Sequence, residues 1–252
     1  MKGLVLAAGY GTRLLPLTQE QAKALLLVND VPVIERILDK ISSLDQVDDI
    51  YIVSNMKFYP KFQDWIKTYL AHSALYVYND GSKNPGDMLG AVKDMEFVIN
   101  KAGIDEDLLV VAGDNLFEFP VKSFCEFAFE KQAPCIAVKD IGDISQAKKF
   151  GVLKLDNEGR VFEFAEKSEN PSSTLISICF YYFPKDTLEL IVQYLEEGHN
   201  PDAPGRFIEW LSERVPVYGW QFSESWFDIG DMESLRKANK LYAGMESEEC
   251  TR

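Results

Sequence analysis

Two glycines, a threonine and an arginine follow the first apolar segment of the chain, in LVLAAGYGTRLLPLT at residues 4–18. Gly9 and Gly11 allow phosphate oxygens to approach backbone N–H groups, and Arg13 offers a two-pronged donor. The loop lacks the third glycine of a dinucleotide-binding fingerprint, because Leu14 stands there, and it lacks the Gly-Lys-Ser/Thr ending of a Walker loop. On these residues alone, a phosphate cradle and a tight structural turn remain equally open.

Two carboxylates stand where a metal ion could bind. Asp114 comes directly after the apolar segment LLVVAG, and Asp228 lies in WFDIGD before the last expected helix. Mg²⁺ is typically held by one or two carboxylates together with substrate phosphates and water. The alternative for each residue is a turn or a helix cap, although Asp231 is the better candidate for capping that helix.

Lysines near these segments could neutralise phosphate. Lys23 precedes the apolar run ALLLV, and Lys167 follows Glu166 at the end of an expected strand. A lysine beside an apolar run often only extends its amine into water. Successive side chains of a strand point to opposite faces, so Glu166 and Lys167 read most simply as a surface pair.

Alternating strand and helix patterns must position these residues. Residues 1–8 and the segments DIYIVSN, ALYVYN, LLVVAGDN and PCIAVKD read as strands. Helical periodicity lies between them, at residues 33–43, 62–70, 89–100 and 123–131. Repeated βα units predict a parallel sheet with helices on both faces.

After residue 150 the pattern changes. GVLKLD and RVFEFAEK are joined by the turn sequence DNEG, which predicts an antiparallel hairpin, and LISICFYYF adds a further strand. Helices are expected at 186–197, 205–214 and 231–242, with the strand VPVYGWQF among them. With no linker or repeat, the chain is predicted to be one α/β domain with a three-layer, mostly parallel mixed sheet.

Composition limits the partners. The formal charge of −14 argues against a general nucleic-acid or anionic-membrane surface. No segment reads as a membrane span or signal peptide, and the four cysteines, Cys125, Cys135, Cys179 and Cys250, are expected as free thiols. We therefore expect a cytoplasmic protein.

At these residues the sequence resembles the sugar nucleotidyltransferases, the sugar-1-phosphate thymidylyl- and uridylyltransferases. Their signature G-x-G-T-R-x-x-P-x-T, followed by K-x-L-L, is matched from Gly9 to Leu26. The resemblance continues through AGDN at 112–115, FGVLKLDNEGRVFEFAEK at 150–167 and WFDIGD at 226–231, and so covers most of the chain.

The resemblance implies a Rossmann-like, glycosyltransferase-A-like fold and a Mg²⁺-dependent activity. The reaction would join a nucleoside triphosphate, with dTTP or UTP expected, to a sugar-1-phosphate, giving an NDP-sugar and pyrophosphate. A single domain of residues 1–252 would bind nucleotide through about 1–140 and sugar phosphate through about 141–230, with a C-terminal helix at about 231–244. A homo-oligomer is compatible with this family.

The resemblance also implies roles for individual residues. Nucleotide binding is expected at Ala8, Gly9, Gly11, Thr12 and Arg13. Independently of the resemblance, residues 79–91 are expected to line the base pocket, with Asp87 and Gly90 among them, because this loop follows a strand at the binding edge and leads into a helix. Sugar-phosphate binding is expected at Lys23, Asn115, Gly151, Glu166 and Lys167. The metal ligands would be Asp114 and Asp228, and the cations acting in catalysis would be Arg13, Lys23 and Lys167.

The segment NDGSKNPGDMLGAV at 79–92 departs from the family, which carries a glutamine and a Pro-x-Gly-Leu-Ala-like loop there to read the base. Asp87 is our candidate base reader, as an acceptor for a base N–H. Two other functions remain open: a cytidylyltransferase acting on a phospho-alcohol such as phosphocholine, and a non-catalytic nucleotide-sensing subunit. The base, the sugar, the oligomeric state and any regulation are left open.

Overall fold

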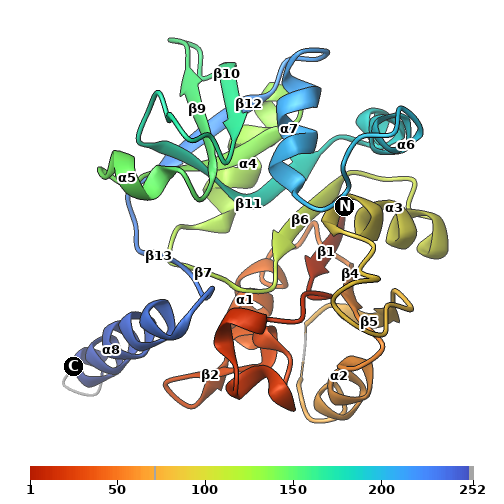
Figure 1. Ribbon diagram of the computed structural model, residues 1–252, viewed down its shortest axis with the longest axis vertical. Coiled ribbons are helices and arrows are strands. Elements are labelled where there is room, and N and C mark those ends of the chain that lie inside the picture. Colours follow the sequence, from red (N-terminus) through yellow and green to blue (C-terminus); the bar gives the residue numbers. More distant parts are fainter. Residues whose placement is uncertain (71, 250–252) are drawn as a thin grey trace.

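One sheet joins strands from both halves of the chain (Figure 1). The computed structural model describes residues 1–70 and 72–249. Within them the main sheet has the order β10-β9-β11-β6-β1-β4-β5, while β8 pairs with β11 and β12 pairs with β8. The strands are β1 (Lys2–Leu6), β4 (Asp49–Ser54), β5 (Ala74–Asn79), β6 (Leu108–Ala112), β8 (Cys135–Asp140), β9 (Gly151–Leu155), β10 (Val161–Glu166), β11 (Leu175–Phe183) and β12 (Tyr218–Phe222).

The strand directions make a mixed, mostly parallel sheet. β1 is parallel to β4 and β6, and β4 is parallel to β5. β11 runs antiparallel to β6, β8 and β9, and β10 runs antiparallel to β9. Among the described strands of this sheet, β10 and β11 alone therefore oppose the common direction, which confirms the predicted sheet type.

Side chains of the strands alternate between two apolar cores, one on each face of the sheet. Leu4 belongs to one core and its neighbour Val5 to the other. The core that includes Val5 is covered by α1 (Val33–Ile41), α2 (Tyr59–Trp65), α4 (Val121–Lys131) and α8 (Met232–Glu249), together with the short α5 (Ile144–Ala147). The core that includes Leu4 is covered by α3 (Ala91–Ala102), α6 (Glu189–Glu196) and α7 (Pro204–Ser212).

Local chemistry explains where some elements begin. The expected helix at 62–70 begins and ends earlier, as α2, since Pro60 fits the first turn of a helix. The expected hairpin is confirmed: Asp156 accepts from the N–H of Glu158 and Arg160, and Gly159 takes a φ of 80°. The helix expected at 186–197 is divided into a 3-10 turn, η4 (Lys185–Thr187), and α6.

Two short strands outside the main sheet bring distant segments together. β7 (Asn115–Phe117) pairs antiparallel with β13 (Trp226–Asp228), so that Asn115 lies opposite Asp228. Immediately afterwards Asp231 accepts the N–H groups of Glu233 and Ser234, and thus caps α8 as expected. A third pair, β2 (Leu27–Val28) and β3 (Val31–Pro32), precedes α1.

Cys125, Cys135 and Cys179 are free thiols, as expected. Cys250 lies outside the described residues. No helix within the described ranges is both long and apolar enough to cross a membrane.

Candidate active site

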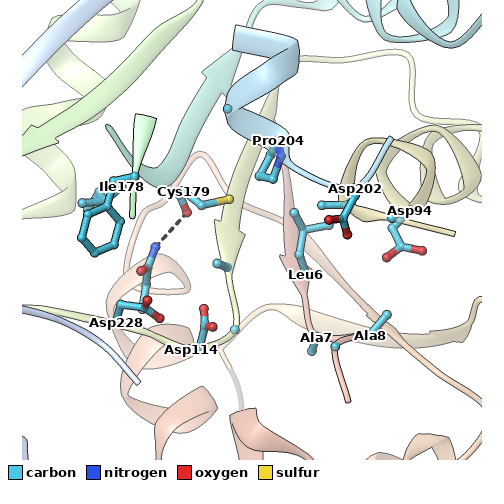
Figure 2. Close-up of a pocket in the computed structure, with 18 of the residues that line it drawn as sticks. Leu6, Ala7, Ala8, Asp94, Asp114, Ile178, Cys179, Asp202, Pro204 and Asp228 are labelled. Carbon is cyan, nitrogen blue, oxygen red and sulfur yellow. Dashed lines mark hydrogen bonds between the residues drawn. The ribbon is translucent and has the colours of Figure 1, made fainter. Parts of the chain in front are cut away.

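A pocket of about 390 Å³ lies where β1, β5 and β6 end (Figure 2). Ligand sites of open α/β sheets form at the carboxyl ends of their strands. Most of the site residues expected from the sequence line this pocket: Ala8, Gly9, Arg13, Lys23, Gly90, Asp114, Asn115, Gly151, Glu166, Lys167 and Asp228.

Gly11 and Thr12 do not line the pocket. Gly11 has a φ of 61°, and its carbonyl accepts the hydroxyl of Thr18 at 2.8 Å. A Cβ at Gly11 would lie 2.8 Å from Thr18 Cγ2. Thr12 begins a 3-10 turn, η1 (Thr12–Leu14), which carries Arg13. Gly11 therefore shapes the turn that carries Arg13.

Asp87 is also absent from the lining, contrary to its expected place beside the base. Its exposed carboxylate accepts the N–H of Asn84 at 2.7 Å and that of Lys83 at 3.2 Å. These hydrogen bonds lower the pKa of Asp87. These hydrogen bonds close the loop. The Asp87 carboxylate follows the two N–H groups by only three and four residues, and so it can reach both of them.

The two expected metal ligands meet through the pairing of β7 with β13. Asp114 directly precedes β7 and its carboxylate pairs with Lys23, while Asp228 ends β13. A Cβ at Gly230 would lie 3.2 Å from Asp228 Oδ2 and 3.3 Å from Arg13 Nη2, so both groups flank that glycine. Burial, and then the nearby charge of Asp114, raise the pKa of Asp228 to about 6.

This donor set fits Mg²⁺. Among the described residues no group of three or more His, Cys, Asp or Glu side chains could hold a metal. Two carboxylates that open on a pocket suit an ion that keeps water and phosphate oxygens in its remaining positions. The crowding of the two negative charges is itself a reason for a cation to bind there.

Glu166 is held between two glycines. A Cβ at Gly151 would lie 2.9 Å from its Oε2, and a Cβ at Gly205, in the first turn of α7, would lie 1.9 Å away. Its side chain is only 7% exposed, and burial raises its pKa, against the opposing charge of Lys167. The glycines thus make room for a carboxylate that lines the pocket.

Lys167 does not follow the alternation expected of a strand. β10 ends at Glu166, and Lys167 has a φ of 52°, in the left-handed region. The residue thus leaves the period of two, and both side chains line the same pocket, with Lys167 Nζ 3.9 Å from Glu166 Oε1. The surface-pair interpretation of these residues is therefore wrong.

Sequence reasoning missed several lining residues. Lys149 adds a cation to Arg13, Lys23 and Lys167. It stands directly before FGVLKLD, but a lysine in a polar segment carries no signal of its own.

Asn115 uses both polar atoms of its side chain within the protein. Its Nδ2 donates to the carbonyl of Cys179 at 3.0 Å, and its Oδ1 accepts from Trp226 Nε1 at 3.2 Å. Figure 2 shows the first of these bonds. The residue ties β7 to β11 and β13, and so supports the neighbouring Asp114.

Acidic side chains also line the pocket: Asp80, from the loop at 79–91 that was expected there, and Asp94 and Asp202, which were not expected. Asp94 lies on α3 and is buried, as are Val92, Met95 and Val98 of the same helix. A charged residue on the buried face of an amphipathic helix was the available signal, since such positions are otherwise apolar.

Residues 2–244 match the family described as Nucleotidyl transferase. A bifunctional protein GlmU of Methanocaldococcus jannaschii is 30% identical over 95% of this chain and 54% of its own length. UTP--glucose-1-phosphate uridylyltransferase AglF of Haloferax volcanii is 28% identical over 73% of this chain and 72% of its own length. The chain thus spans about half the length of the first of these relatives.

Two solved structures share the fold. A UDP-glucose pyrophosphorylase complexed with UDP-glucose superposes with a TM-score of 0.82 at 21% identity, over 97% of this chain and 98% of the other. A putative glucose-1-phosphate thymidylyltransferase from Bacillus anthracis, in complex with a sucrose, gives 0.77 at 22% identity, over 96% and 94%.

Proposed function

Because the chain belongs to the nucleotidyl transferase family, we propose that it transfers a nucleotidyl group from a nucleoside triphosphate to a sugar-1-phosphate. UTP or dTTP is the expected donor. One observation carries the proposal: a single pocket gathers the side chains of Arg13, Lys23 and Lys167, the carboxylates of Asp114 and Asp228 and the enclosed carboxylate of Glu166. Within this domain, residues 1–140 would bind the nucleotide and residues 141–230 the sugar phosphate.

The reaction joins two anions, so alignment and charge neutralisation are its main requirements. A phosphate oxygen of the sugar-1-phosphate attacks the α-phosphorus, the bond from that phosphorus to the bridging oxygen breaks, and pyrophosphate leaves. Arg13 would bind the departing phosphates, while Lys23 and Lys167 would hold the attacking phosphate. A phosphomonoester with a second pKa of about 6 is already largely dianionic at neutral pH, so no general base is needed.

Asp114 and Asp228 would hold Mg²⁺, which when bound neutralises charge on the phosphates. Glu166 would accept hydrogen bonds from sugar hydroxyls. Its enclosure between Gly151 and Gly205 fixes the carboxylate, so that a hydroxyl has a defined partner. An acceptor without hydroxyls would leave that buried carboxylate unpaired, which disfavours its binding.

A pyrophosphate-release assay tests the proposal. UTP, dTTP, CTP, GTP and ATP are each combined with a panel of hexose-1-phosphates and Mg²⁺, with CTP and phosphocholine as the competing pair. We expect at least one hexose-1-phosphate to be turned over in preference to phosphocholine. Faster turnover of phosphocholine would favour the cytidylyltransferase alternative. Nucleotide binding with no turnover of any pair would favour a sensing subunit.

A further inference from the structure

Asp94 is a buried acidic residue of the pocket, and one oxygen of its side chain lacks a partner. It is 5% exposed, and its Oδ1 is buried without a hydrogen bond. Buried polar atoms of native proteins are nearly always hydrogen-bonded, so an unpartnered one inside a ligand pocket calls for an explanation. A bound ligand that completes the hydrogen bonds of this carboxyl group is the simplest one.

The surroundings of Asp94 exclude a phosphate as that ligand. The charge that acts on Asp94 is that of Asp80, which is half-buried and already accepts the N–H and hydroxyl of Ser82. Asp202 lines the same pocket from the segment before α7. Figure 2 places Asp94 and Asp202 across the pocket from Asp114 and Asp228, with Leu6 between them. One side of the pocket therefore suits phosphate, and the other suits an uncharged group.

The position of Asp94 is fixed before any ligand binds. Gly90, with a φ of 90°, begins α3, and a Cβ there would lie 2.6 Å from the carbonyl oxygen of Pro201. The N–H of Val92 donates to the same carbonyl at 2.9 Å, and the N–H of Asp94 donates to Gly90 at 2.9 Å. The first turn of α3 is thereby locked against the segment that carries Asp202.

We propose that Asp94 determines base specificity: its carboxyl group, as the neutral acid, donates one hydrogen bond to a base carbonyl and accepts one from the adjacent base N–H. The ligand class is a nucleobase with an imide edge, uracil or thymine. This inference rests on the proposed function, because it places the base of the donor nucleotide on this side of the pocket. No glutamine occurs at residues 79–92 to play such a part.

The ionisation of Asp94 supports this pairing. Burial, and then the charge of Asp80, raise the pKa of Asp94 to about 8, so the group keeps its proton at neutral pH. A neutral carboxyl has one donor and one acceptor, as a carboxamide does, whereas an ionised carboxylate accepts only and would repel the carbonyls of an imide.

Two variants of Asp94 separate the possibilities, by calorimetric titration of UTP, dTTP, CTP and GTP with Mg²⁺ at pH 7 and pH 9.5. Asp94→Asn keeps one donor and one acceptor and should bind UTP within about threefold of wild type at pH 7. Asp94→Leu should weaken UTP and dTTP by roughly tenfold or more, and the other nucleotides less. Asp64→Asn, at an exposed position of α2, is the matched control for the loss of one carboxylate.

The pH dependence of UTP affinity discriminates more strongly than the comparison at one pH. Wild-type affinity for UTP should fall about tenfold for each pH unit above 8, and Asp64→Asn, which keeps Asp94, should fall in the same way, whereas Asp94→Asn should fall much less. The assignment is overturned if Asp94→Leu weakens all four nucleotides equally, if it leaves UTP binding unchanged, or if Asp94→Asn binds UTP as weakly as Asp94→Leu at pH 7. If the proposed function itself is wrong, the result is a different one: the protein binds nucleotide but forms no NDP-sugar.

Discussion

The pocket has two sides that differ in the charges around their polar groups. One contains Lys23 and Asp114, where we expect phosphate, and the other contains Asp94 and Asp80, where we expect the base. On the proposed phosphate side a cation and a carboxylate pair with each other, Lys23 with Asp114. On the other side Asp94 is buried without a hydrogen bond for Oδ1 and has an acidic neighbour in Asp80. The difference teaches that groups which face charged ligands can pair with one another while the site is empty, as Lys23 does with Asp114, whereas the charged neighbour of Asp94 is another acid.

Removing a metal carboxylate should give the largest effect and tests the phosphate side. Asp114→Asn and Asp228→Asn should each lower kcat by roughly 10²–10³ or more, since losing one preorganised electrostatic contact costs that much in other enzymes. Folding should persist, as judged by circular dichroism, because both substitutions are isosteric. More than about a tenth of wild-type activity at saturating Mg²⁺ in both folded variants would contradict the metal assignment.

Substitutions of Lys167 and Glu166, neighbours in the proposed acceptor site, should affect different sets of acceptors. Lys167→Ala should impair every phosphorylated acceptor, because its target is the phosphate. Glu166→Gln should raise KM for a hexose-1-phosphate by roughly tenfold, since a carboxylate to hydroxyl bond is among the stronger hydrogen bonds. The measurement is kcat/KM for several acceptors at fixed nucleotide. Identical acceptor profiles for the two variants would remove the distinction between phosphate and sugar contacts.

Most residues that line the proposed phosphate side could be predicted from the sequence because they lie in short continuous motifs. The spacing of residues identifies the loop of Gly9 to Arg13 and the segment WFDIGD. The place of Asp231 before α8 likewise predicted that it caps this helix. The alternation of strands and helices likewise predicted a mostly parallel sheet.

The other features depend on contacts between distant segments. The pairing of Asn115 opposite Asp228 joins residues that no local pattern connects. The positive φ of Lys167 interrupts a strand whose sequence is strand-like throughout. The periodicity of the helix could place Asp94 on its buried face, but the pocket into which that face opens depends on the neighbouring elements. Tertiary packing decided each of these cases.

A methyl group at Gly205 should disturb the acceptor site alone. A Cβ there would lie 1.9 Å from Glu166 Oε2, too close for both atoms to keep their places, so Gly205→Ala should displace that carboxylate. We expect KM for the sugar phosphate to rise by several-fold, a smaller effect than that of Glu166→Gln, with the affinity for UTP unchanged. An unchanged KM in a variant of wild-type thermal stability would show that Glu166 moves without consequence for the sugar.

The last prediction concerns stability, on the base side. The pKa of Asp94 is about 8 in the folded protein and near its ordinary value of 3.8 when unfolded. Between these values the folded state binds the extra proton, so this residue makes wild-type stability fall as pH rises from about 4 to about 8. Asp94→Asn removes this dependence. Its Tm relative to wild type should therefore rise between pH 5 and pH 8, by about 2–4 °C for each kcal/mol recovered. Calorimetric scans of both proteins, with Asp64→Asn as the control, measure this difference, and a Tm difference that stays constant across that range would contradict the elevated pKa.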